Sequence, residues 1–156
     1  MDIKDSGTRR EFDTGAVRDI QEGKGRCDLM PLEVVSKVLK DPMLETISDF
    51  MLDGDTFFLE CAINDFSEEF KNKYDMFLEV AIHFEQGALK YGENNWQKGI
   101  PVHCYIDSAV RHYLKYRRGD TDEPHDRAFV WNLLCAMWTC KNKPELNEYK
   151  KGDEQQ

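Results

Sequence analysis

The amino-acid sequence predicts an all-α protein, a compact helical bundle of about five to six helices with an extended N-terminal arm. Three observations lead to this prediction. Apolar residues recur at helical spacing from residue 32 onward, and no segment shows the clean two-residue alternation of a strand. The length of 156 residues suffices for one sizeable core. We therefore treat residues 1–156 as a single domain.

Residues 1–31 are predicted to form the arm. Four glycines and Pro31 interrupt any long helical period in this segment. Its Gly23-Lys24-Gly25-Arg26 stretch could offer backbone N–H groups and two cations to a phosphate. The same four residues are equally compatible with a simple turn.

The middle of the chain shows three helical runs. Pro31 opens the first, over 32–40, because proline is favoured in the first turn of a helix. An Asp-Pro step ends that run, and a second follows over 43–52. After an Asp-Gly turn, Asp55 suits the N-cap of a third helix, whose apolar residues extend to Phe66.

Three longer helices are expected in the second half. The apolar spacing predicts helices over 72–90, 103–117 and 125–140. Residues 91–102 are rich in Gly, Asn and Pro and are predicted to form a loop. The charged tail, 141–156, is expected to fray.

The charge distribution limits the partners of this protein. The chain carries 21 basic and 30 acidic side chains, a net charge of −9, and residues 32–80 alone carry −8. Binding to duplex nucleic acid needs a basic footprint, so none is expected. No apolar run reaches the length of a membrane span, and no apolar leader opens the chain. Five cysteines without a Cys-x-x-Cys pair favour a reducing cytoplasm.

Two histidines lie near carboxylates in the sequence. Asp107, Arg111 and His112 fall within little more than one helical turn, and Asp122 precedes His125 by three residues. Such groups ligate metals or transfer protons in many proteins. The simpler interpretation is an ordinary helix histidine, together with acids that favour a helix N-terminus electrostatically.

Two further features are compatible with binding of a metal or a nucleobase. Glu123 and Asp126 have the spacing that lets two carboxylates share one cation if the turn is helical there. Asn95 and Trp96 bring an amide and an indole into the predicted loop. These groups suit a nucleobase, although a buried, anchoring tryptophan is the commoner use.

Four blocks of sequence carry a resemblance to a known family. They are Arg10-x-Phe12-x-Thr14-Gly15-Ala16-x-Arg18-Asp19-x-x-x-Gly23-Lys24-Gly25-Arg26-x-Asp28-Leu29-x-Pro31, Gly87-Ala88-x-Lys90-Tyr91-Gly92-x-x-Asn95-Trp96-x-Lys98-Gly99, Asp107-Ser108-Ala109-x-Arg111-His112, and His125 with Trp131-Asn132. In this order the blocks resemble the dATP/dGTP diphosphohydrolase N-terminal domains of phages and bacteria. Residues 41–71 have no counterpart in the resemblance and look like an acidic helical insertion.

The resemblance places the chain with the MazG-like all-α nucleoside triphosphate pyrophosphatases. It implies a homo-oligomer that uses Mg²⁺ or Mn²⁺ to cleave a purine deoxynucleoside triphosphate to the monophosphate and pyrophosphate, in phage nucleotide metabolism. The alternative is a non-catalytic nucleotide-binding protein, such as a phage sponge for a nucleotide signal. Because Mg²⁺ prefers oxygen ligands, a site containing histidine would favour Mn²⁺.

Within this interpretation we assign roles to particular residues. The predicted catalytic residues are Glu85, Asp107 and His112. The predicted metal ligands are Glu85, Asp107, Asp122 and His125. The residues predicted to bind the nucleotide are Arg18, Lys24, Arg26, Lys90, Asn95, Trp96, Arg111 and Asn132.

Overall fold

The computed structural model describes residues 2–151 and confirms the all-α helical bundle. In the described part, the α-helices are α1 (Leu32–Leu39), α2 (Pro42–Asp53), α3 (Thr56–Ser67), α4 (Lys73–Tyr91), α5 (Val102–Arg118) and α6 (His125–Asn142). Each corresponds to a helix predicted from the apolar spacing. Over these residues, no helix combines the length and the apolar character that crossing a membrane would require.

Side-chain caps explain where several helices begin. The Asp41 carboxylate accepts hydrogen bonds from the backbone N–H groups of Met43 and Leu44, so α2 begins at Pro42 directly after α1 ends. Asp55 caps α3 in the same way, as predicted, and Asn72 caps α4. These caps pair N–H groups that have no partner within the helix.

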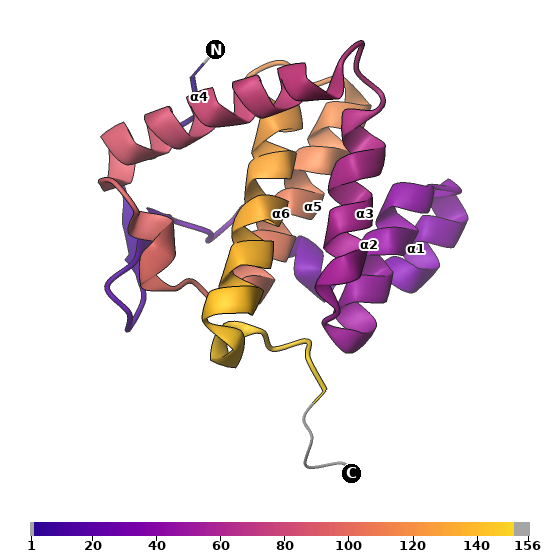
Figure 1. The fold of residues 1–156 in the computed structure, drawn as a ribbon, viewed down its shortest axis with the longest axis horizontal. Helices are drawn as coiled ribbons and strands as arrows, with labels where there is room; N and C mark the ends of the chain where they lie inside the picture. The colour runs from indigo at the N-terminus through magenta and orange to yellow at the C-terminus, as the bar shows by residue number, and fades with distance from the viewer. Residues whose placement is uncertain (1, 152–156) are drawn as a thin grey trace.

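The helices pack in two parts around the α5–α6 pair. Figure 1 shows α4 crossing one end of this pair, with the arm on one side and α1–α3 on the other. In the core, the Phe66 ring on α3 lies edge-on to Phe129 on α6, with centroids 4.8 Å apart, and to Tyr116 on α5, with centroids 5.4 Å apart. The predicted insertion, 41–71, therefore buries an apolar face against α5 and α6.

The arm contains a small β-ribbon that the sequence analysis did not predict. Strands β1 (Arg9–Glu11) and β2 (Val17–Asp19) pair antiparallel, with Arg10 opposite Arg18. Each strand has three residues, too few for a two-residue alternation to be recognised. Gly15 takes a positive φ of 88° in the connecting turn, a conformation that glycine adopts without steric cost.

The C-terminal segment is ordered over 141–151, so the expectation of fraying is wrong there. After α6, a short 3₁₀ helix, η3 (Pro144–Leu146), leads the chain back to α2. The Asn147 side chain donates to the Gly54 carbonyl at 3.1 Å, and the Tyr149 ring lies 5.5 Å from that of Phe50. Buried contacts thus outweigh the charge of this segment. Residues 152–156 of the predicted tail lie outside the described residues.

Candidate functional site

A cavity of about 520 Å³ lies between the arm, α4, α5, α6 and the 3₁₀ helix η2 (Asn95–Lys98). Pockets for small molecules and cofactors commonly measure about 300–1,000 Å³, a range that includes nucleotide sites. The cavity is the place where segments far apart in the sequence come together.

The wall of the cavity is basic although the whole chain is acidic. Its cationic side chains are Lys4, Arg10, Arg18, Lys24, Arg26, Lys90, Arg111 and Lys115. The acidic side chains of the described lining are Asp5, Asp19, Asp107 and Glu123. Basic residues therefore outnumber acidic ones here in a chain whose net charge is −9. A concave surface of this kind favours an anionic ligand.

The structure brings together all of the residues predicted to bind the nucleotide. Those residues are Arg18, Lys24, Arg26, Lys90, Asn95, Trp96, Arg111 and Asn132, and each lines this cavity. They come from the arm, α4, η2, α5 and α6. Their shared location is a geometric result, and their contact with a nucleotide stays a prediction.

Two asparagines of this set hold the arm in place. The Asn95 side chain accepts from the Val17 N–H at 2.8 Å and donates to the Val17 carbonyl at 2.7 Å, as a neighbouring strand would. The side-chain Oδ1 of Asn132 accepts a hydrogen bond from the Arg18 guanidinium at 3.1 Å. These amides already have protein partners, so they position Val17 and Arg18 and are less available to read a base.

Asp107 also holds the arm in place, through a hydrogen bond to its backbone. It is buried, and its two oxygens accept from the Cys27 N–H at 2.6 Å and from the Arg111 guanidinium at 2.5 Å. Burial raises the pKa of the Asp107 carboxyl. Arg111 in turn donates to the Gly25 carbonyl at 2.8 Å. The pair therefore fixes the Gly25–Cys27 turn against α5, whereas the sequence analysis expected Asp107 to ligate a metal.

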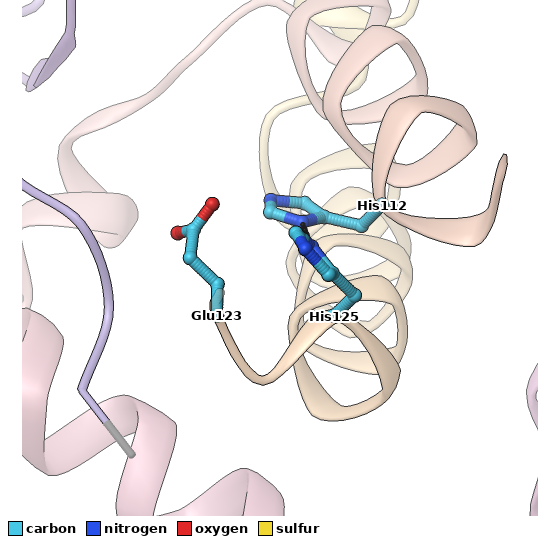
Figure 2. Close-up of side chains that lie close together, drawn as sticks. All are labelled: His112, Glu123 and His125. Carbon is cyan, nitrogen blue, oxygen red and sulfur yellow. Dashed lines mark hydrogen bonds between the residues drawn. The ribbon is translucent and has the colours of Figure 1, made fainter. Parts of the chain in front are cut away.

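At one end of the cavity, His112, Glu123 and His125 point toward one another (Figure 2). They come from α5, from the following turn and from the first position of α6. One potential ligand atom of each lies within 4.8 Å of the others. The two Nδ1 atoms of the histidines are 2.9 Å apart and share a hydrogen bond. His125 Nε2 also hydrogen-bonds the Asp122 carboxylate at 2.7 Å.

Neighbouring charges and burial shift the pKa values of Asp122 and His112. The Lys4 ammonium, 2.6 Å from Asp122, and the His125 ring hold the pKa of the Asp122 carboxyl well below its usual range. Burial, aided by neighbouring positive charge, lowers the pKa of His112, so its ring is neutral at pH 7. The Asp122 carboxylate accepts a hydrogen bond from His125 Nε2, which leaves His125 Nδ1 facing Nδ1 of His112.

Comparison with known proteins identifies the segment that carries most of this site. Residues 73–149 match the sequence model of the family described as dATP/dGTP diphosphohydrolase, N-terminal. The match supports the predicted family over that segment, which is just under half of the chain. Searches of curated proteins and of solved structures gave no match to the chain. The family segment includes α4, η2, α5 and α6, which form the cavity opposite the arm.

The structure brings some of the predicted catalytic and metal-binding residues of this segment together and leaves others apart. His112, Asp122 and His125 lie together, and the structure adds Glu123 to them. Asp120, Asp122 and His125 form a second, overlapping group of potential ligands. Glu85 is exposed on α4, outside the described lining of the cavity and outside both groups. The structure therefore does not bring Glu85 to the site.

His83 and Trp131, which were not among the predicted site residues, also line the cavity. Burial and nearby cations lower the pKa of His83 to about 3. In the described part of the chain, His83 Nδ1, Trp131 Nε1 and one terminal nitrogen of Arg18 are buried without a hydrogen-bond partner. Buried polar atoms without a partner are uncommon in folded proteins, and here they leave the cavity wall with unused hydrogen-bonding capacity. The signal was the spacing of His83, Gly87 and Lys90, which places all of them on one helix face.

Proposed function

We propose that this protein is a nucleotide diphosphohydrolase that converts a purine deoxynucleoside triphosphate into the monophosphate and pyrophosphate. The observation that carries the proposal is the basic cavity of an otherwise acidic chain, which is bordered by the His112–Glu123–His125 group. The description of the family names the same class of reaction.

The cavity offers separate surfaces for the phosphates and the base. Arg18, Lys24, Arg26 and Lys90 supply the positive charge on the side of the arm and α4. Aromatic rings form another part of the lining. The Phe84 ring is 5.5 Å from Trp96 and 5.7 Å from Trp131, centroid to centroid. In this arrangement the triphosphate lies along the cations and the base lies against the indoles.

The reaction requires a water oxygen to bond to the α-phosphorus while the bond from that phosphorus to the bridging oxygen of pyrophosphate breaks. The water also loses a proton, and burial lowers the pKa of His112 at that end of the cavity. A divalent ion of the kind that the family implies would neutralise phosphate charge and lower the pKa of the water. His112, Glu123 and His125 are the residues that would hold it.

The test is a product assay with the full chain. We expect dGTP and dATP, with Mg²⁺ or Mn²⁺, to yield deoxynucleoside monophosphate and pyrophosphate in equal amounts, and dCTP and dTTP to react more slowly. Nucleotide binding is measured in parallel by calorimetry in the presence of a chelator. If the protein binds nucleotide tightly in chelator and releases no product with either ion, it is a binding protein and not an enzyme.

Homo-oligomerisation stays a prediction. The outer face of α4 provides a surface that would suit it, since Tyr74, Leu78, Ile82 and Leu89 are exposed there at near-helical spacing. Sedimentation of the full chain would measure the oligomeric state directly.

A further inference from the structure

The carboxylates that line the cavity differ in how fully they are bonded. Asp107 has partners on both oxygens, and Asp19 accepts from Ser6 and Lys24. Within the described residues, Glu123 accepts one hydrogen bond, from the Lys4 N–H to Oε1 at 3.1 Å. Glu123 is therefore the lining carboxylate with the greatest remaining capacity to accept a ligand, and it faces two histidines.

We propose that Nδ1 of His112, Nδ1 of His125 and the carboxylate of Glu123 form a binding site for a divalent first-row transition ion of the Mn²⁺ type, in preference to Mg²⁺. This inference deepens the proposed function and rests on it for the reaction that the ion would serve. The binding site itself is argued from geometry alone.

The separation of the two histidines fits a shared ion. Two nitrogens that bind one ion at about 2.0–2.1 Å, with an angle of about 90–110° between them, lie about 2.8–3.4 Å apart. The observed Nδ1···Nδ1 separation is 2.9 Å. An ion bound to both nitrogens would lie off the line that joins them, and the proton that now joins the two rings would have to leave. The ion would release this proton, because ligating imidazoles are neutral and bind through a lone pair.

A carboxylate orients the more buried ring. His125 is 2% exposed, and its Nε2 atom lies 2.7 Å from Asp122 Oδ1. A histidine that binds a metal through one nitrogen commonly donates the proton of its other nitrogen to a carboxylate, which fixes the tautomer. Asp122 is thus a positioning residue for His125 and stays outside the set of direct ligands.

A cation already lies beside this group. The Lys4 ammonium is 2.6 Å from Asp122 Oδ2, and the backbone N–H of Lys4 donates a hydrogen bond to Glu123 Oε1. The acidic side chains around the two histidines are therefore placed where they attract positive charge. Two nitrogens and one carboxylate suit Mn²⁺, Co²⁺ or Zn²⁺, whereas Mg²⁺ requires oxygen ligands in a near-ideal octahedron.

Binding of Mn²⁺ to the full chain, without nucleotide, tests the site. We expect at least tenfold tighter binding of Mn²⁺ than of Mg²⁺ by calorimetry, in line with the preference for nitrogen ligands. Pulsed electron paramagnetic resonance of the Mn²⁺ complex should show ¹⁴N coupling from directly bound imidazole. His112→Gln should weaken the binding of Mn²⁺ and reduce the coupling, and Asp122→Asn should weaken binding by about 10–100-fold.

Glu123→Gln and Glu85→Gln form a matched pair, because both replace a glutamate carboxylate by an amide and Glu85 lies outside the group. The first should weaken Mn²⁺ binding and the second should leave it unchanged. Helical circular dichroism checks that each variant is folded. Absence of ¹⁴N coupling, or equal losses in the two glutamate variants, would overturn the site. Failure of hydrolysis with these binding results intact would overturn the proposed function and leave the metal site standing.

Discussion

Helices α1–α3 and the cavity wall differ in how fully their buried polar atoms are hydrogen-bonded. Helices α1–α3 bury Leu44, Ile47, Phe50 and Leu59 completely, and Ser67 Oγ is the buried side-chain polar atom without a partner there. Around the cavity, unpartnered nitrogens belong to Arg18, His83, Arg111 and Trp131. Both groups of atoms are taken from residues 2–151, the part of the chain that the structure describes.

This difference separates a closely packed apolar core from a cavity wall that has unpartnered side-chain nitrogens. Buried polar atoms without partners cost free energy, so a fold retains them where a ligand or water completes their hydrogen bonds. The acidic charge follows the same division, because residues 32–80 carry a net charge of −8 while the cavity wall is basic. Repulsion by the acidic helices therefore directs an anion toward the cavity.

The largest effect that would sharpen this comparison is expected at Phe66. Phe66→Ala removes a fully buried ring that packs edge-on against Phe129 and Tyr116. We expect a loss of about 3–5 kcal/mol in the free energy of unfolding, measured by urea denaturation. Phe57→Ala, on the exposed side of the same helix, should cost less than about 0.5 kcal/mol. Similar losses in the two variants would show that α3 is not packed as described.

A smaller effect is expected on the cavity side, in binding and not in folding. Arg18→Gln removes a cation whose buried terminal nitrogen has no partner among residues 2–151. We expect the affinity for dGTP in chelator to fall by about 1–3 kcal/mol, the range for charged hydrogen bonds. Arg118→Gln is the control, since its exposed side chain pairs with Asp120 outside the cavity. An equal loss in both variants would indicate unspecific attraction by positive charge.

The smallest effect concerns pH and His83. Its folded-state pKa of about 3 lies below the unfolded value of about 6.5. Between these values the unfolded chain binds a proton that the folded chain does not, so stability falls as the pH drops through this window. His83→Gln should reduce the slope by up to one proton, about 1.4 kcal/mol per pH unit. Parallel slopes for variant and wild type would show that His83 takes up its proton in the folded protein.

Local sequence patterns determined the helices. Apolar spacing, the Asp41 and Asp55 caps and the glycine-rich turns act over a few residues, so the predicted helices agree with the observed ones apart from small differences at their ends. The β-ribbon and the ordered segment 141–151 were not predicted. Both are stabilised by contacts with distant residues, such as Asn95 with Val17 and Asn147 with Gly54.

The eight residues predicted from the sequence to bind the nucleotide line one cavity, but Glu85, predicted to be catalytic and to bind the metal, lies outside its described lining. Only the tertiary structure decided which atoms each residue contacts. Asn95 and Asp107 are bonded to the arm, Glu85 faces away, and Glu123 joins the two histidines. The physical reason is that hydrogen bonds and metal geometry depend on distances of a few ångströms between elements. Spacing along one helix fixes a face, but the packing of α5, α6 and the arm fixes which atoms meet.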